Sequence, residues 1–589
     1  MKIFSKLAAA LLTAAIFFTP IRAEAIDAWG AAIGALGAWG SYESTLVSIL
    51  RLGNDVNAQM AARRQDIKTN GTDKNPRDVQ LVNAVMTQLV NHGTYELRAN
   101  SLPFIWHVND DEKLNAACYP MNYITVNRGL LQVMNYDENK IAAVLAHEMT
   151  HGISQHSAKN YAKAAAQSVG AVMIGAAADS RNIDWSKFAG MVNYSIAKNI
   201  VTPTEYEADE GGFYLMTSAG FNPGGGAAAM ARMDYYLRFE TRDFLEYDAH
   251  DKPSEQTFSD HPDTEVREEK LSQLLTDYSC GHVKVKKADR QYKVFIDGKL
   301  IYTASNTGGQ NNSADKAYYF AGGLARAFHD YDSISAWNFR SGAGNSVDFL
   351  DDSYVFRQLR EIAFVENIGA KIRDAVTAAY QKDKNRQKYV DADKKRLAAW
   401  QRVKFEALAT SAGYARQLRI NADAYNDYEE GKLALKEIAR AMQAQNQDNP
   451  AECLAIRGRA KAICKDFTGA LEDTNTAVAQ DSTNLYNFLN RSDVRRMRGE
   501  TDLALADIDA AIKIDATNPI PYQLRGNIFD KLGDSATAEE NFRKCYELSK
   551  KNPYLIPLKY LEKIDAEAAE KIRKVNPDAD KQDSKTSAQ

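Results

Sequence analysis

A repeat of 34 residues in the C-terminal third is the feature that most restricts the fold of this chain. Three sets of small residues recur with this step: Gly458, Ser492 and Gly526; Ala470, Ala504 and Ala538; and Ala477, Ala511 and Cys545. Small residues at a fixed interval are expected where paired helices must approach closely, and repeats of this length stack as helix pairs. The region therefore predicts an α-solenoid.

The repeat resembles the tetratricopeptide repeat in its period, in the placing of its small residues and in the turn Leu532-Gly533-Asp534. A degenerate earlier copy is expected near Arg416. We assign residues 416–565 to a repeat domain and residues 566–589, which are polar, to a disordered tail. Repeat arrays of this kind present a concave surface, so the resemblance implies a protein partner bound by the repeats.

The first 25 residues predict an export signal. Lys2 and Lys6 precede the apolar stretch Leu7 to Phe18, and Ala23-Glu24-Ala25 forms an A-x-A cleavage site. The alternative is an uncleaved anchor, but the stretch is shorter than the roughly 20 residues that span a bilayer. We expect an exported protein, periplasmic in a host with two membranes, without a transmembrane segment in the mature chain; peripheral membrane contact stays open.

Composition excludes several other classes of protein. A length of 589 residues predicts three or four domains, and 73 basic against 77 acidic residues give no reason to expect nucleic acid as a partner. Five cysteines without a CxxC pair fit neither a disulfide framework nor a cysteine-held zinc site. Cys118 and Cys280 could pair in an oxidising compartment. Cys453 and Cys464, about 16 Å apart on one helix, could not.

A metal-binding pattern lies on a predicted helix that begins after Asp137, a plausible N-cap. His147-Glu148-Met149-Thr150-His151 is an H-E-x-x-H sequence, which places two imidazoles on one helix face and Glu148 beside them. This spacing is what a zinc hydrolase requires. The alternative is a surface helix with two ordinary histidines.

Catalytic zinc usually has three protein ligands, so a third must come from elsewhere. The metzincin arrangement fails because Ser154 and Ser157 stand where Gly and His are needed. A carboxylate is the common remaining choice. On a helix predicted from about Pro203 to Ser218, Glu205 could bind the ion, while Asp209 accepts a hydrogen bond from a ligand imidazole.

These motifs resemble the gluzincin family of HtpX and the CAAX prenyl endopeptidases, over roughly residues 45 to 275. The matching segments are Leu145 to His151, Gln155-His156-Ser157, Glu205 to Asp209, Ala219 to Pro223, and the loop Ser259 to Thr264 with Arg267. Together with the export signal and the repeats, they resemble the periplasmic BepA-like branch of that family. The resemblance implies one Zn²⁺ per chain, held by His147, His151 and Glu205, with Glu148 as general base.

The resemblance also directs attention to three further features. His261 could donate to the oxyanion or block the metal as a fourth ligand, unless it is an ordinary loop histidine. His156, five residues beyond His151, is expected to face away from the ion and to be structural. The predicted strand Tyr123 to Asn127 could pair with an extended substrate.

The chain is therefore expected to be mainly α with small β elements. We assign residues 1–25 to the signal, 26–279 to a zinc metallopeptidase domain, and 280–415 to an inserted mixed region. The insertion contains a predicted hairpin at Asp297-Gly298 and a charged helix from Tyr380 to Arg402. The predicted function is a zinc-dependent endopeptidase acting on envelope proteins. The alternative is a repeat-based scaffold or chaperone with a latent or structural metal site.

Overall fold

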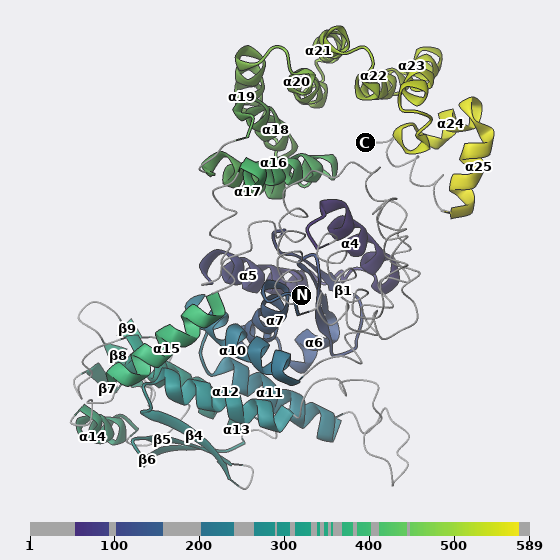
Figure 1. The fold of residues 1–589 in the computed structure, drawn as a ribbon. Helices are drawn as coiled ribbons and strands as arrows, with labels where there is room; N and C mark the ends of the chain where they lie inside the picture. The colour runs from purple at the N-terminus through teal and green to yellow at the C-terminus, as the bar shows by residue number, and fades with distance from the viewer. Residues whose placement is uncertain are drawn as a thin grey trace, which may run out of the picture. The chain divides into compact units, whose positions relative to one another are not determined.

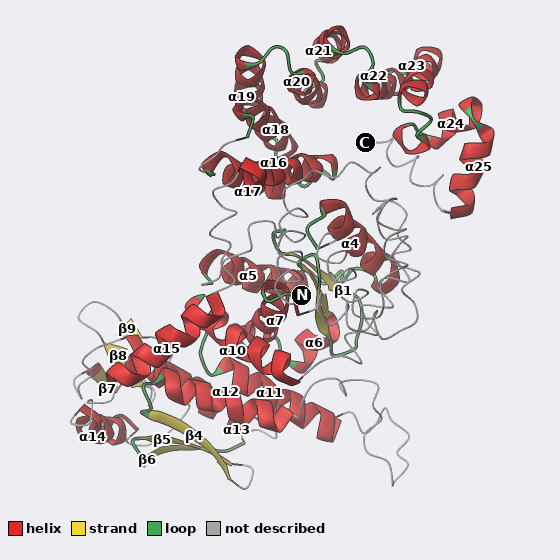
Figure 2. Cartoon of the chain, in the orientation of Figure 1, coloured by secondary structure: helices red, strands yellow, loops and turns green. Residues whose placement is uncertain are grey.

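The computed structural model shows a mainly helical protein with three small sheets among its described residues (Figures 1 and 2). The described residues are 53–93, 102–156, 202–240, 264–288, 291–306, 312–330, 338–341, 347–350, 355–356, 368–380, 386–401, 412–444 and 448–575. The predicted fold class is confirmed. The expected signal at residues 1–25 lies outside the described part. No helix within that part has both the length and the apolar character of a membrane span.

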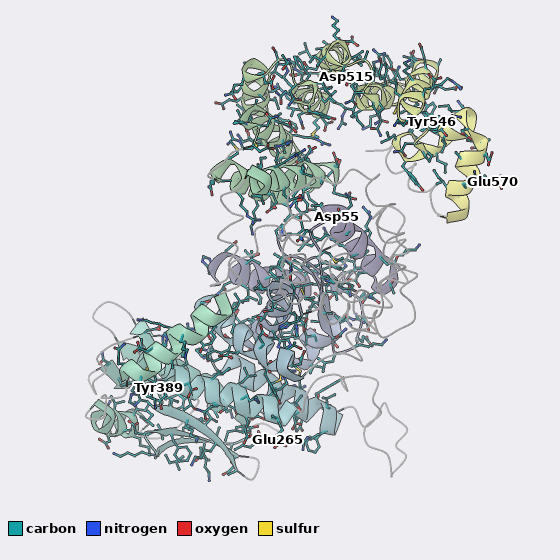
Figure 3. All side chains as sticks on the ribbon, viewed as in Figure 1. Asp55, Glu265, Tyr389, Asp515, Tyr546 and Glu570 are labelled. Carbon is teal, nitrogen blue, oxygen red and sulfur yellow. The ribbon has the colours of Figure 1, made fainter. Side chains whose placement is uncertain are left out.

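The chain divides into two compact units, Met1–Lys404 and Phe405–Gln589. In the first unit, helices α4 (Val56–Asn70) and α5 (Pro76–His92) precede the first sheet. Each is capped as its sequence requires: Asp55, labelled in Figure 3, accepts a hydrogen bond from Asn57 N at the start of α4, and Asn75 does the same for Arg77 N at the start of α5.

The first sheet contains β1 (Ile105–Asn109), β2 (Ala116–Tyr119) and β3 (Tyr123–Asn127) in the order β1-β3-β2. Strand β3 pairs in parallel with β1 and antiparallel with β2. Both of its hydrogen-bonding edges are therefore used, and all five of its residues are buried. The expectation that Tyr123 to Asn127 could add a substrate strand is wrong, because β3 is paired on both sides and the outer strand next to the histidine helix is β2.

Helix α6 (Arg128–Val133) leads into the histidine helix α7 (Glu138–Ile153). The side chain of Asp137 accepts hydrogen bonds from Asn139 N and Lys140 N, which confirms the predicted N-cap. All residues of α7 from position 140 to 153 are buried, so this helix runs through the core of the unit.

Helix α10 (Thr202–Ser218) packs directly against α7. Gly212 permits the close approach: a Cβ at this position would lie 2.8 Å from His147 N and 3.0 Å from His147 Cα. The helix ends at Ser218, and the chain turns at Gly220, whose φ of 96° favours glycine. The expected boundaries of this helix are confirmed to within one residue.

Helix α11 (Gly225–Tyr235) packs against α7 and is followed by the π-helical turn Tyr236–Glu240, and α12 (Thr264–Tyr278) packs against α10 and α11. Strands β4 (Val283–Ala288), β5 (Gln291–Ile296) and β6 (Lys299–Ala304) form a second, antiparallel sheet. Asp297 and Gly298, with φ values of 48° and 81°, make the turn between β5 and β6, which confirms the predicted hairpin.

Helix α13 (Ser313–Asp330) covers this sheet and contacts α11 and α12, so one continuous hydrophobic core includes buried residues from Val82 to Val376. The boundary expected at residue 279 thus does not separate two compact units. Strands β7 (Phe339–Ser341), β8 (Val347–Leu350) and β9 (Val355–Phe356) follow, with α14 (Ile368–Tyr380) and α15 (Arg386–Gln401). The charged helix expected from Tyr380 to Arg402 corresponds to α15.

The second unit is an array of helix pairs. They are α16 (Ala412–Asp427) with α17 (Gly431–Gln443), α18 (Pro450–Ile463) with α19 (Phe467–Gln480), α20 (Leu485–Met497) with α21 (Thr501–Ile514), and α22 (Pro519–Lys531) with α23 (Ser535–Leu548). The repeated residues Ala470, Ala504 and Ala538 are each 0% exposed, and a Cβ at Gly458 would lie 2.8 Å from Ala470 O, so small residues allow the close contact of α18 with α19.

The array continues through the 3₁₀ turn Pro553–Leu555, α24 (Leu558–Ile564) and α25 (Ala566–Val575). Ala569 of α25 is fully buried in a cluster with Leu561 and Tyr560. The tail expected to be disordered from residue 566 is therefore helical over its first ten residues, because the apolar face of α25 packs on α24. Residues 576–589 lie outside the described part.

Candidate metal centre

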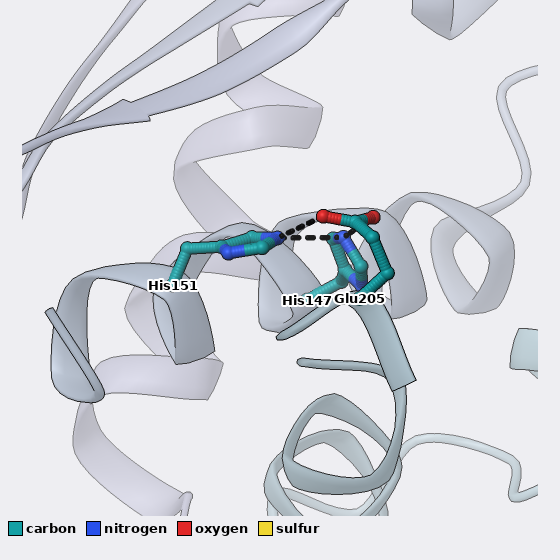
Figure 4. A group of neighbouring side chains, drawn as sticks. All are labelled: His147, His151 and Glu205. Atoms are coloured by element: carbon teal, nitrogen blue, oxygen red, sulfur yellow. Dashed lines mark hydrogen bonds and ion pairs between the residues drawn. The ribbon is translucent and has the colours of Figure 1, made fainter. Parts of the chain in front are cut away.

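The structure brings His147, His151 and Glu205 together (Figure 4). The two histidine Nε2 atoms, from successive turns of α7, lie 3.0 Å apart. Glu205, from the first turn of α10, places Oε2 3.4 Å from His147 Nε2 and Oε1 3.2 Å from His151 Nε2. Among the described residues, this is the one group of three or more side chains arranged as metal ligands.

The geometry and the donor set fit a zinc ion. Ligand atoms held tetrahedrally at about 2.0–2.2 Å from one zinc lie roughly 3.3–3.6 Å from one another. The Nε2–Nε2 distance of 3.0 Å and the distances of 3.4 Å and 3.2 Å from the two Glu205 oxygens to His147 and His151 are close to that range, and one ligand atom from each residue lies within 4.8 Å of the others. Two imidazoles and one carboxylate are also a common ligand set of catalytic zinc.

Asp209, one helical turn beyond Glu205 on α10, contacts the Nδ1 side of the His147 ring, opposite the Nε2 that faces the metal site. His147 Nδ1 lies 2.9 Å from Asp209 Oδ1. Asp209 also accepts two hydrogen bonds from Arg267 of α12, from Nε at 2.8 Å and from Nη2 at 2.6 Å. The structure therefore places Asp209 where the sequence predicted, in contact with a ligand imidazole.

Burial alone would raise the pKa of Asp209, but Arg267 and His147 outweigh burial and hold it far below its usual range. Asp209 is thus a carboxylate at neutral pH. Burial and Arg267 lower the pKa of His147, yet hydrogen bonds to Asp209 and Glu205 raise it to about 9. Burial lowers the pKa of His151 to about 4. Of the two imidazoles, His147 is therefore the one that carries the additional proton in the absence of metal, and a metal ion must displace that proton.

Glu148 lies beside the two histidines and is tied to the first sheet. Its Oε2 accepts a hydrogen bond of 3.0 Å from the backbone N–H of Cys118 in β2. Glu148 is 8% exposed, which fits a carboxylate at the wall of a site rather than on a solvated helix face. A small cavity next to His147 and Glu148 is lined mostly by apolar side chains, including Val144, Met216, Met230 and Leu271.

His156 lies behind His151. Its Nδ1 is 3.1 Å from His151 Nδ1, the ring nitrogen away from the metal site, so His156 is not among the metal ligands but contacts one of them. The reason is local: α7 ends at Ile153, and Gln155 takes up a left-handed conformation with φ 56°, which turns the chain back. Helical spacing did not predict this contact with His151, because the helix ends three residues before His156.

Two further residues gained a role only from the structure. Arg267 was singled out by resemblance alone, and its ion pair with Asp209 spans 58 residues. Gly212 gave no sequence signal beyond its place in a helix. His261, the expected second catalytic residue, lies outside the described residues, so its role stays a prediction.

All five cysteines are free. Cys118 and Cys280 do not pair, because they are buried at separate places in the first unit, against the first sheet and against the end of α13.

Comparison with known proteins agrees with this site. Residues 80–275 match the family model of peptidase family M48. This region is similar to the M48 metallopeptidases, and it contains His147, His151 and Glu205 in an arrangement that fits a zinc site. The predicted enzyme class and cofactor are confirmed for this region, whereas the narrower BepA-like resemblance stays a prediction.

Two individual proteins resemble parts of the chain. The mitochondrial metalloendopeptidase OMA1 of Schizosaccharomyces pombe is 34% identical over 128 residues, which is 22% of this chain and 37% of that protein. The chain thus spans little more than a third of this curated relative. The crystal structure of MamA aligns with 29% of this chain and 96% of its own, at 19% identity and a TM-score of 0.20.

Proposed function

We propose that this protein is a zinc-dependent endopeptidase that cleaves other proteins, and that its helical repeats bind substrates or partner proteins. The observation that carries the proposal is the convergence of His147, His151 and Glu205 with Glu148 beside them, inside the M48 region.

Zinc bound at this site supplies a Lewis acid for a peptide carbonyl and lowers the pKa of a water molecule toward about 7. The side chains of the protein transfer the protons and orient the metal ligands. Glu148 takes the proton of the attacking water and returns it to the leaving amine. The Cys118 N–H holds Oε2 of Glu148 and so orients the carboxylate. Asp209 holds His147 with its Nε2 toward the metal.

Strand β2 is the element best placed to hold an extended substrate. Its other side is paired with β3, and the Cys118 N–H points away from β3 toward Glu148. The outer edge of β2 therefore faces the site, and peptides commonly bind proteases by adding a strand to such an edge. The apolar cavity beside Glu148 favours substrates with an apolar side chain near the cleaved bond.

The first 25 residues support export, so envelope proteins that are misfolded or await processing are the proposed substrates. N-terminal sequencing of protein from the envelope fraction tests the export proposal. The expected mature chain begins at Ile26, after the A-x-A site. Recovery of chains that retain Met1 in the cytoplasm contradicts it.

Glu148→Gln in the full-length protein tests the catalytic proposal. The variant is expected to lose at least 1,000-fold of its cleavage of an unfolded protein such as casein while still binding one zinc per chain. Glu138→Gln, an exposed Glu on the same helix, is the matched control and keeps wild-type activity. Full activity of Glu148→Gln would refute the peptidase proposal. Rescue of in-cell function by the inactive variant would instead favour the scaffold or chaperone.

A further inference from the structure

The second metal ligand, His151, contacts His156, and His156 contacts Glu207; the proposed mechanism uses neither of these two side chains. Its Nδ1, on the side of the ring away from the metal site, lies 3.1 Å from Nδ1 of His156. Nε2 of His156 in turn lies 3.2 Å from Oε2 of Glu207. His156 is 1% exposed, so this contact is made in the protein interior.

The direction of each hydrogen bond follows from the chemistry of neutral imidazole, which carries one N–H donor and one acceptor nitrogen. Nε2 of His151 faces the metal site and must be unprotonated to bind zinc, so its proton lies on Nδ1. His156 must then accept at Nδ1 and carry its own proton on Nε2. That Nε2–H donates to the Glu207 carboxylate, which is an acceptor only.

This arrangement combines residues that follow the C-terminal end of α7 with a residue near the N-terminal end of α10. The left-handed Gln155 returns the chain after α7 and brings the His156 ring edge-on to His151, with centroids 5.1 Å apart and planes at 73°. Glu207 lies on α10 between Glu205 and Asp209. Ser154 Oγ donates to Glu207 Oε1 at 3.1 Å, and His156 contacts Oε2, so each oxygen of the Glu207 carboxylate has a partner from the segment after α7.

We propose that His156 is a positioning residue for the zinc ligand His151, and that Glu207 fixes the tautomer of His156. The two histidine ligands are then oriented by different kinds of partner. His147 is oriented by the buried carboxylate of Asp209, which Arg267 neutralises. His151 is oriented by the neutral imidazole of His156, whose own partner, Glu207, has a side chain 55% exposed. The arrangement orients His151 without a second fully buried anion, which would be costly beside Glu205 and Glu148. This proposal rests on the proposed zinc site.

Zinc affinity of the full-length protein, measured by competition with a chelator of known affinity, tests the proposal apart from activity. His156→Ala is expected to weaken zinc binding 10- to 100-fold, the range found when such outer partners are removed. His156→Asn, whose Oδ1 can accept near the position of Nδ1, is expected to recover at least half of that loss on a logarithmic scale. His92→Ala, an exposed histidine at the end of α5, is the matched control.

The visible absorption spectrum of the cobalt-substituted protein gives a second measure, because it responds to ligand orientation and not to general stability. We expect a changed spectrum for His156→Ala and a near-normal one for His156→Asn. Wild-type zinc affinity in His156→Ala overturns the proposal, as does an Asn variant as weak as the Ala variant.

If the Ala variant does not fold, Glu207→Gln is expected to weaken zinc binding three- to tenfold, and unchanged affinity refutes the role of Glu207. Glu148→Gln, measured in parallel, separates the outcomes: if it retains activity, the peptidase proposal fails while the zinc measurements still decide the role of His156.

Discussion

Lys140 in the histidine helix and Asp315 in α13 form an ion pair of 2.7 Å across 175 residues of sequence. Lys140 is 1% exposed, so its ammonium group is buried and depends on this carboxylate. Tyr319, one turn after Asp315, donates a hydrogen bond to Asp137, the N-cap of the same helix. The segment beyond residue 280 therefore stabilises the start of the helix that carries the metal ligands.

Lys140→Met tests how much this ion pair contributes to the free energy of unfolding. The Asp315 carboxylate would keep its partly buried position without a cation, and we expect a loss of about 3 kcal/mol in the free energy of unfolding of the first unit. The double variant Lys140→Met with Asp315→Asn should recover much of that loss, because no unpaired charge remains. Urea unfolding of the full-length protein measures both, with the exposed Lys113→Met as control. Equal destabilisation of the single and double variants would contradict this account.

The ion pair between Asp209 and Arg267 supports the metal site more directly. Asp209→Asn removes the charge that holds His147 and leaves the buried Arg267 guanidinium without its carboxylate. We expect zinc affinity to fall 10- to 100-fold, again measured by chelator competition. Asp277→Asn, a partly exposed position on α12, should leave the affinity unchanged. Unaltered affinity in Asp209→Asn would show that His147 is oriented by other contacts.

Local patterns were enough to predict the parts of the site that lie on single helices. His147, Glu148 and His151 follow from spacing on one helix, and Glu205 with Asp209 follows from the same rule on another. The helix pairs of the second unit follow from the recurring alanines. Each of these depends on residues no more than 34 positions apart.

Other features could not be predicted, because they depend on how distant segments meet. The central place of β3 is set by pairing with both β1 and β2, and a strand pattern does not reveal the order of strands in a sheet. The contact of His156 depends on where α7 ends, which is the least certain part of a helix prediction. The inclusion of α13 in the first core depends on contacts such as that between Lys140 and Asp315.

Gly212 provides a test of how closely α10 must approach α7. In Gly212→Ala the new Cβ would lie 2.8 Å from His147 N, a backbone atom that can move only with its helix. We expect a separation of the two helices, weaker zinc binding by at least tenfold, and a loss of about 2 kcal/mol in stability. Gly226→Ala is the matched control, because there the Cβ meets the flexible end of Leu271 at 3.2 Å. Equal effects of the two variants on zinc affinity would argue against a specific role for Gly212.

The state of the cysteines can be read from thiol titration. Four of the five, Cys118, Cys280, Cys453 and Cys545, are buried, and Cys464 is exposed. The native protein should therefore react rapidly with an aromatic disulfide reagent at one thiol, and the unfolded protein should react at five without prior reduction. Cys464→Ser should abolish the rapid phase. Three thiols in the unfolded, unreduced protein would reveal a disulfide that the structure does not contain.

The lowered pKa of Asp493 predicts how the stability of the second unit depends on pH. Burial alone would raise the pKa of this carboxyl, but Arg459 of α18 and Arg496 of its own helix hold it below the ordinary value of 3.8. A carboxyl with a lowered folded-state pKa stabilises the protein fully at pH values above 3.8, and that stabilisation disappears as the pH falls through the folded-state pKa.

Asp493→Asn should therefore destabilise the second unit by about 2 kcal/mol at pH 7. The difference from the wild type should stay constant down to about pH 5 and shrink as the pH falls below about 4. Thermal unfolding of the full-length protein at a series of pH values gives this difference. The matched control Asp509→Asn, whose side chain is 55% exposed, should change stability by less than about 0.5 kcal/mol at pH 7. A difference that instead grew on acidification would mean that the two arginines do not stabilise the charged form of Asp493.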